Sequence, residues 1–447
     1  MRKKLTLSEN LLIGSLLFGL FFGAGNLIFP LELGQRSGSN ITLVTIGFLL
    51  SAVSLPILAV VATAASDSES LFDLSKAAGS KFAYFFTTLL YLTIGPGFAI
   101  PRTATTTYEV IFEGSQRFYN SKGLFIFSLI FFGLVLYFSI RKGRLIDTIG
   151  KFMTPMFLIL LSLLLILSII KPMGPVGVAE PTERYLKNSL AVGFVDGYNT
   201  LDAPAGLAFA IIIISNIKEL KVTDKKSMAK ETLKSGLVCL IAMSLIYSGL
   251  SFMGGAASNI LDDFVNGAVI LATISEHYLG ELGHLILSLI VFIACLKTAI
   301  GLVSACSEMF EEMYNNKINY KKYCVIFSIV SFLIANLGLN QIITLSLPVL
   351  MFIYPISIVL IFLSIISIFI GKKKFVYELT LSVTGIFAFL DFLKASPDFI
   401  SKSSLVTKIL GFASESLPGF EIGFAWVIPA LMAFLIAFII DKNRSRN

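Results

Sequence analysis

The chain has 447 residues, of which 56% are hydrophobic and 14% are charged, and its formal net charge is +7 at pH 7. A soluble domain usually has about a quarter of its residues charged, so this composition excludes an ordinary soluble domain. The positive balance does not indicate nucleic-acid binding, because most basic residues lie in short segments between long apolar runs. The length suits one polytopic membrane domain.

Apolar runs of about 20 residues, the length that crosses a bilayer as a helix, predict an all-α protein with about twelve membrane spans. The predicted spans are 9–33, 41–65, 82–107, 122–140, 147–170, 188–217, 232–255, 283–308, 322–338, 341–370, 375–394 and 420–440. An even number of spans places both termini on the same side of the membrane.

The basic residues indicate which side that is. Of the 35 Lys and Arg residues, 24 lie on the side that carries the termini and nine lie on the opposite side. By the positive-inside rule the richer side is cytoplasmic. We therefore expect a multi-pass protein of the plasma membrane with cytoplasmic N- and C-termini. The segment Thr6-Leu7-Ser8-Glu9 predicts a capping box at the start of the first helix.

The first span contains the run GAGNLIFP at residues 23–30, which we predict is not ordinary helix because glycine interrupts helices and proline lacks a donor. Irregular backbone survives in a bilayer only where it lines a cavity or is buried in protein. An unwound turn here would free N–H groups that can hold a carboxylate. Asn26 adds an amide oxygen that could coordinate Na⁺. Gly19 and Gly23 could instead form a GxxxG pair that serves helix packing.

The third span is also expected to be distorted, because residues 95–105 read GPGFAIPRTAT. It carries Arg102, and Glu109 follows one to two turns later. We interpret these two residues as a structural or gating pair rather than as direct substrate contacts.

The sixth span contains a second interrupted run, DGYNTLDAP, at residues 196–204. Placing a carboxylate inside a membrane span costs free energy, so we expect Asp202 to have a function there. It could pair with a substrate ammonium, carry a proton or bind a cation, and the structural alternative is a salt bridge to Arg102.

Two features follow in chain order. Residues 266–278 have an apolar pattern too short to cross the membrane, and they could form a lid helix on the outer mouth. Lys297 lies about midway through the eighth span, within ACLKTAIG. A lysine there must pair, lose its proton or snorkel to an interface. Its ammonium has nearly the charge and reach to replace a bound Na⁺.

The two broken spans lie five spans apart, which predicts two inverted repeats. The first covers residues 1–171, the second covers 188–370, and residues 375–441 add two accessory helices to a single domain. Broken spans at corresponding places in two halves indicate the substrate site of a transporter. We therefore predict substrate contacts at the two breaks, from Gly23, Ala24, Gly25, Asn26, Tyr198, Asn199, Thr200 and Asp202.

The motifs GAGNLIFP at 23–30, AIPRTAT at 99–105, GYNTLDA at 197–203 and TAIGL at 298–302 resemble the bacterial branched-chain amino acid:cation symporters, the BrnQ family. The resemblance runs through all twelve spans. It implies import of leucine, isoleucine and valine driven by Na⁺ or H⁺, and a LeuT-type 5+5 inverted-repeat fold. No cofactor is implied beyond the coupling ion.

The resemblance also implies roles for single residues. The N–H groups of Ala24 and Gly25 would hold the substrate carboxylate, and a Na⁺ would lie beside Asn26 and Thr200. A second cation site would be formed by Gly19, Phe22, Lys297 and Thr298. Na⁺-coupled relatives have paired hydroxyls at the last two positions, so Lys297 is a departure. Asp202 likewise replaces a residue that is neutral in LeuT.

Other classes of function fit the sequence less well. A membrane-embedded enzyme is disfavoured because the sequence has no HExxH motif and no nucleophile with a partnered base. A channel, an amino acid sensor that retains the fold, or a transporter of another small neutral amino acid remain alternatives. No P-loop is present, so ATP drive would need a separate subunit. The expected partners are a small-molecule substrate and the lipid bilayer, with no nucleic acid and no obligatory protein partner.

Overall fold

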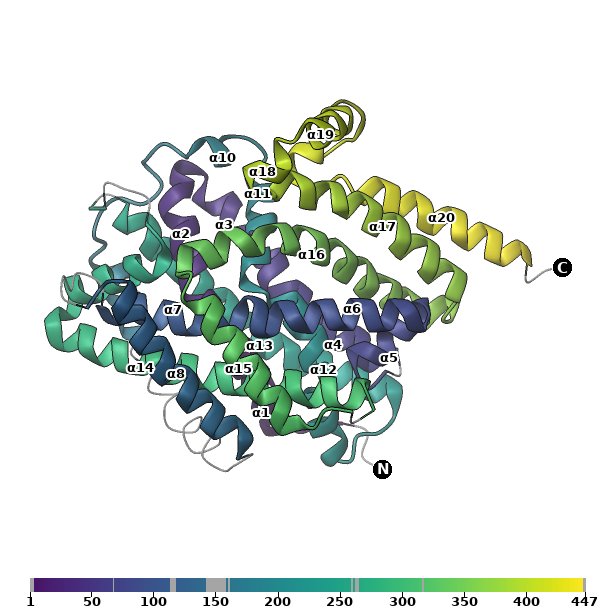
Figure 1. The fold of residues 1–447 in the computed structure, drawn as a ribbon, viewed down its shortest axis with the longest axis horizontal. Coiled ribbons are helices and arrows are strands. Elements are labelled where there is room, and N and C mark those ends of the chain that lie inside the picture. Colours follow the sequence, from purple (N-terminus) through teal and green to yellow (C-terminus); the bar gives the residue numbers. More distant parts are fainter. Residues whose placement is uncertain are drawn as a thin grey trace.

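The computed structural model describes residues 4–66, 68–112, 118–141, 158–159, 161–258, 260–261, 265–315 and 317–444. Every regular element in these ranges is helical (Figure 1). The first half comprises α1 (Leu7–Phe21), α2 (Ala24–Ser37), η1 (Gly38–Asn40), α3 (Ile41–Leu49), η2 (Leu50–Ser54), α4 (Leu55–Ala65), α5 (Leu71–Ser75), η3 (Lys76–Ala78), α6 (Ser80–Leu92), η4 (Thr93–Gly97), α7 (Ala99–Phe112), α8 (Ser121–Ile140) and a helix over Leu161–Ile170.

The second half begins with a short outer helix and ends with the C-terminal pair. It comprises α10 (Glu183–Leu186), α11 (Ser189–Asp196), η5 (Gly197–Thr200), α12 (Asp202–Glu219), α13 (Lys225–Ala257), α14 (Gly267–Met313), α15 (Tyr320–Ala335), α16 (Leu339–Ile370), α17 (Lys374–Ala395), α18 (Asp398–Ser401), α19 (Ser404–Ser416), η6 (Phe420–Ile422) and α20 (Val427–Arg444).

Seven helical stretches of the described chain are long and apolar enough to cross a membrane, and the number becomes eight if a pair bent by 48° counts as one span. The bent pair is Ser189–Thr200 with Asp202–Glu219, the predicted sixth span. One stretch, Ala24–Ala65, joins the end of the predicted first span to the second. The beginning of the predicted fifth span, 147–157, lies outside the described residues. The chain is thus an all-helical membrane protein.

Each broken span packs against a helix of the other half of the chain. α2 packs against α13, and α12 packs against α4. α17 and α20 pack on each other, and Figure 1 shows the pair at the edge of the molecule, with α16 beside α17. This arrangement leaves the two breaks enclosed by other helices.

The distortion predicted in the third span is present. Thr93–Gly97 forms a π-helical turn, and Gly95 departs from helical geometry with φ −94° and ψ −124°. A helix also forms over the segment that the sequence suggests as a lid, while its role as a lid stays a prediction. It begins at Gly267 with Asn266 as its cap, and it is separated from the rest of α14 by Gly280, whose φ is +64°. Only glycine adopts this backbone conformation without strain.

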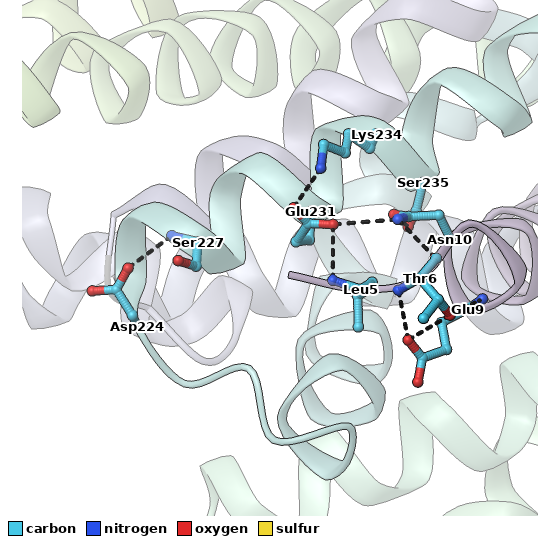
Figure 2. A network of polar contacts seen from close by, with 9 residues as sticks. All are labelled: Leu5, Thr6, Glu9, Asn10, Asp224, Ser227, Glu231, Lys234 and Ser235. Atoms are coloured by element: carbon cyan, nitrogen blue, oxygen red, sulfur yellow. Dashed lines mark hydrogen bonds and ion pairs between the residues drawn. The ribbon is translucent and has the colours of Figure 1, made fainter. Parts of the chain in front are cut away.

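The start of α1 carries the predicted capping box. The Glu9 N–H donates to the Thr6 hydroxyl at 3.3 Å, and the Thr6 N–H donates to the Glu9 carboxylate at 2.7 Å. Asp224 caps α13 in a similar way through the Ser227 N–H (Figure 2).

A buried carboxylate joins these two helix ends. Glu231 of α13 is fully buried and accepts from the Leu5 N–H and from the Asn10 amide, both at 3.2 Å (Figure 2). Lys234 pairs with its other oxygen at 2.7 Å, and Ser235 donates to Asn10 at 2.9 Å. Hydrogen bonds therefore hold the start of α1 against α13.

Candidate functional site

The first break is shorter than the sequence predicts. α1 ends at Phe21, Phe22 and Gly23 are extended, and α2 resumes at Ala24. The prediction that residues 23–30 are all irregular was therefore wrong. Pro30 lies inside α2, where its missing N–H costs one helical hydrogen bond without ending the helix.

The second break is a 3₁₀ turn followed by one left-handed residue. Gly197–Thr200 forms the turn, and Leu201 has φ +64° and ψ 11°. α12 begins at Asp202, so the predicted irregular run was too long at its end as well. Pro204 falls in the first turn of α12, where a backbone N–H has no helical acceptor and none is lost.

Both breaks face one cavity. Its lining comes from four parts of the fold: the first break, the start of α7 with η4, the second break with α12, and the middle of α14. The lining residues are Leu20, Phe21, Gly23, Ala24, Gly25, Asn26, Ile94, Ala99, Arg102, Thr103, Thr200, Leu201, Asp202, Ala205, Phe209, Thr298 and Leu302. Six of the eight predicted substrate residues are therefore brought together here.

The cavity is tight in this conformation. Its volume is about 50 Å³, enough for a few water molecules, whereas pockets that hold small molecules measure roughly 300–1,000 Å³. A ligand the size of an amino acid would require the walls to separate. The N-terminus of α2 opens onto this space, and its first N–H groups have no acceptor within the helix.

Asp202 connects the two breaks. Its Oδ2 accepts from the Asn26 amide at 2.8 Å and from the Tyr247 hydroxyl at 3.0 Å, and the side chain is 2% exposed. These partners are neutral, and no cationic side chain of the described chain compensates the carboxylate. A buried carboxyl in such surroundings favours a bound proton or a bound cation.

The oxygens predicted to hold Na⁺ are already engaged. The Asn26 amide oxygen accepts from the Gly23 N–H at 3.1 Å. The Thr200 hydroxyl donates to the Gly197 carbonyl at 2.9 Å. Both residues line the cavity, and hard oxygen donors of this kind suit an alkali cation. In this conformation, however, their hydrogen bonds shape the two breaks.

Arg102 does not form either of the ion pairs considered for it. It is 2% exposed, and it donates to the Asn199 carbonyl at 2.6 Å and to the Ser346 hydroxyl at 3.3 Å. The expected pair with Glu109 does not form, and neither does the salt bridge that was the structural alternative for Asp202. Its guanidinium lies over the Phe29 ring, 4.9 Å from the centroid, and lines the cavity.

Glu109 lies further along α7 and bonds elsewhere. Its carboxylate accepts from the Tyr119 hydroxyl, and it lines a different cavity. The spacing of residues along α7 does not show which neighbouring helix packs against each of its faces. The partners of Arg102 and Glu109 therefore could not be read from the sequence.

Two predicted substrate residues point away from the cavity. Tyr198 is fully buried and stacks on Tyr354, with ring centroids 4.0 Å apart. The Asn199 amide donates to the Asp196 carbonyl at 3.2 Å, and only its own carbonyl reaches Arg102. Neither residue is part of the cavity lining, so their predicted substrate contact is not present here.

The residues predicted for a second cation site are partly assembled. Thr298 of α14 meets the first break, since a Cβ at Gly23 would lie 3.3 Å from its methyl group. Lys297 is half-buried and does not line the cavity. A Cβ at Gly19 would meet nothing within 4 Å, so the helix-packing alternative for Gly19 is not supported. Phe22 stacks on Phe18 at 5.0 Å.

Sequence reasoning missed two polar neighbours of the breaks. Tyr247 lies in α13 and bonds Asp202, and Ser346 lies in α16 and bonds Arg102. Each helix carries several other hydroxyl side chains, so the sequence could not single out the one that reaches a break.

Comparison with known proteins gives a consistent result. A family model described as "Branched-chain amino acid transport protein" matches residues 6–444. The branched-chain amino acid permease BrnQ of Lactobacillus delbrueckii subsp. lactis is 44% identical over 450 residues, with all of both chains covered. The permease of the same name from Bacillus subtilis (strain 168) is 38% identical over 452 residues, again covering both chains fully.

A solved structure shares the fold. The inward-facing conformation of Mhp1 matches with a TM-score of 0.64 at 12% identity, covering 97% of this chain and 91% of that one. The curated relatives are permeases, so the interpretation as a membrane-embedded enzyme is discarded. The chain belongs to the branched-chain amino acid transport protein family.

Proposed function

We propose that the protein is a secondary active importer of leucine, isoleucine and valine, driven by a gradient of H⁺ or Na⁺. One observation carries the proposal: the two helix breaks face a single cavity and are joined through Asn26 and Asp202 at 2.8 Å. Irregular backbone at membrane depth is where transporters of this kind bind substrate and ion. The permease names of the relatives are consistent with this substrate class.

The substrate would lie with its carboxylate at the start of α2. The N–H groups of Ala24 and Gly25, together with the positive end of the helix dipole, suit an anion. Arg102 lies beside Gly25, because a Cβ added there would be 3.4 Å from its Nη1. A branched aliphatic side chain would contact the apolar part of the lining, which includes Phe21, Ile94, Ala99, Phe209 and Leu302.

Asp202 would couple substrate binding to the cation. A buried carboxylate among neutral donors becomes stable when it gains a proton or a Na⁺, and either event would change its bonds to Asn26 and Tyr247. Asn26 belongs to the first break and Tyr247 to α13. A change in the charge of Asp202 would therefore change the contacts between the two halves of the chain.

We further propose twelve spans in a 5+5 inverted repeat, with cytoplasmic termini in the plasma membrane. Two helix crossings support the repeat. A Cβ at Gly34 of α2 would overlap the Ser251 carbonyl of α13, and a Cβ at Gly206 of α12 would lie 2.5 Å from the Pro56 carbonyl of α4. In each crossing, a glycine in the second part of one broken span approaches the span that follows the broken span of the other half.

Uptake of labelled leucine into proteoliposomes tests the function. We expect accumulation above the external concentration under an inward H⁺ or Na⁺ gradient, and loss of accumulation when an ionophore dissipates it. Equilibration without accumulation would indicate a channel. Binding without uptake under either gradient would indicate a sensor. Competition by isoleucine and valine, but not by alanine or serine, would distinguish branched-chain transport from transport of another small neutral amino acid.

A further inference from the structure

A second buried aspartate lies outside the central cavity, in one of the two C-terminal accessory helices. Asp391 is near the C-terminal end of α17, and the residue is 1% exposed. Neither of its carboxylate oxygens has a hydrogen-bond partner. Burying an ionised carboxylate without partners costs far more free energy than burying the neutral carboxyl group. The position therefore suits a group that carries a bound proton.

The cation whose charge acts on Asp391 is Lys394, and this lysine is bound elsewhere. It lies three residues further along α17. Its Nζ donates to the Glu421 carboxylate at 2.8 Å, to the Glu421 carbonyl at 3.0 Å and to the Phe420 carbonyl at 3.2 Å. An ammonium has three donors, so these three contacts leave none for Asp391.

The helices that pack on α17 place no further buried charge beside Asp391. α16 has no charged residue, and its one titratable side chain is Tyr354. α20 has no titratable residue before Asp441, which lies in its second half. The charged residues that α18 and α19 carry are exposed, and they are Asp398, Lys408 and Glu415.

Tyr198 connects Asp391 to the second break. It lies in η5, directly before Asn199, whose carbonyl accepts from Arg102 at 2.6 Å. Its ring stacks on Tyr354, and its buried hydroxyl has no hydrogen-bond partner. The charge of Asp391 acts on this hydroxyl. An ionised Asp391 would therefore attract an O–H donor that is free in this conformation.

The ligand that suits Asp391 is a proton and not a metal ion. A hard metal cation needs several oxygen ligands and space between them. Asp391 lines neither the central cavity nor the cavity that contains Glu109. A proton needs no such space. A neutral Asp391 also agrees with the absence of any hydrogen bond between its carboxyl group and Tyr198 in the described structure.

We propose that Asp391 is a proton-binding site separate from the central cavity, and that Tyr198 links its occupancy to the position of the second break. With the proton bound, Asp391 is neutral and Tyr198 keeps the position seen here. When the proton leaves to water, the carboxylate accepts from the Tyr198 hydroxyl, and η5 moves with it. Leucine binding would move the same break, so the two ligands influence each other reciprocally.

Infrared spectroscopy of the purified full-length chain tests the site, because the C=O stretch of a protonated carboxyl group is resolved from the amide bands. Wild type should show a carboxyl band that disappears as the pH rises, and Asp391→Asn should lack this band. Tyr198→Phe should keep the band to a pH that is higher by about one unit or more, because the ionised carboxylate loses its donor. Glu378→Gln, at an exposed carboxylate of the same helix, is the matched control and should titrate as wild type does.

The link to leucine rests on the proposed function, whereas the proton site does not. Saturating leucine should change the intensity of the Asp391 band in wild type, and it should leave the band unchanged in Gly25→Leu. If Asp391→Asn does not fold, the shift in Tyr198→Phe identifies the group. Asp202, the other buried aspartate near the breaks, accepts from Asn26 and Tyr247 instead.

Several results would overturn the inference. Identical spectra of wild type and folded Asp391→Asn at every pH would mean that Asp391 stays ionised. A band that persists at every pH would make Asp391 a permanently neutral group of the core. An unshifted band in Tyr198→Phe would remove Tyr198 from the account.

The remaining outcomes separate this inference from the proposed function. If wild type binds leucine and the band does not respond, the link to the second break is contradicted and the proposed function stands. If wild type does not bind leucine, the link and the proposed function fail together, while the shift in Tyr198→Phe still supports the proton site.

Discussion

At the scale of single residues, the central cavity is governed by Asp202 and Arg102, two buried charged groups that do not pair with each other. Asp202 has neutral partners, while Arg102 binds a backbone carbonyl and a serine hydroxyl. Opposite charges that are kept apart in one cavity leave each able to meet a complementary charge on a substrate or ion. This separation suits a site that must bind and release its ligand.

Asp202→Asn is expected to abolish gradient-driven leucine uptake, because it keeps the shape of the side chain and removes the charge that would bind a proton or a cation. Uptake should be at background between pH 5 and 8. Asp398→Asn, at an exposed carboxylate of α18, is the matched control and should transport normally. Normal uptake by Asp202→Asn at every pH would leave Asp202 with a structural role only.

Lys297 should make transport H⁺-coupled, or at least independent of Na⁺ at the second site. The ammonium of a lysine within a span could occupy the place of a bound Na⁺. The measurement is uptake in Na⁺-free buffer with an inward proton gradient, by wild type, Lys297→Thr and Lys297→Met. We expect wild type to be active and both variants to be impaired. An inactive wild type there, with normal Na⁺-driven uptake by Lys297→Met, would make the lysine a bystander.

At the scale of elements, the two half-helices on either side of the first break contact α13 in different ways. The start of α1 is fastened to α13 by the buried Glu231, whereas α2 meets α13 through a glycine crossing at Gly34. The hydrogen bonds of Glu231 can break and re-form as α1 moves. The crossing at Gly34, in contrast, requires the backbones of α2 and α13 to stay close together.

Glu231→Ala should loosen the first turn of α1. It removes the acceptor for the Leu5 N–H and the Asn10 amide, and leaving such groups unpaired costs about 1–3 kcal/mol. Hydrogen exchange at residues 5–10 should become faster, with the rest of α1 less affected. Glu219→Gln, at an exposed residue that ends α12, is the control. Unchanged exchange at Leu5 in Glu231→Ala would mean that the contacts do not hold the turn.

Gly34→Ala should destabilise the protein by about 1–3 kcal/mol, because the added methyl forces α2 away from the Ser251 carbonyl. Gly133→Ala in α8 is the matched change in a membrane helix, since its Cβ would meet nothing within 4 Å. Thermal unfolding of the two purified variants provides the comparison. Equal melting temperatures would argue against a close crossing at Gly34.

Much of the element level could be predicted from the sequence. Hydropathy located most of the long apolar helices but not α19, the Thr6–Glu9 capping box formed, and glycine marked both breaks. The lengths of the breaks were overestimated, because proline is tolerated within α2 and within the first turn of α12. The partners of Arg102 and the contribution of Tyr247 could not be predicted, since they depend on how helices far apart in sequence rotate against each other.

At the scale of the whole molecule, the two halves of the chain each contribute one broken span to a single tight cavity, and a different cavity lies further along α7. The small central volume means that binding an amino acid must separate α2, α7, α12 and α14. A mechanism that alternates access around the breaks is the expected consequence, with substrate binding and helix movement linked.

The central claim is that substrate binds between the two breaks, and leucine uptake by Gly25→Leu tests it most directly. The leucine side chain would occupy the space in front of the α2 N-terminus, close to Phe29 and Arg102. Proteoliposomes containing wild type, Gly25→Leu or the control Gly133→Leu, reconstituted at equal amounts, would be given labelled leucine under the effective cation gradient. The account predicts accumulation by wild type and Gly133→Leu and background uptake by folded Gly25→Leu. Uptake by Gly25→Leu at the wild-type rate and affinity would contradict it.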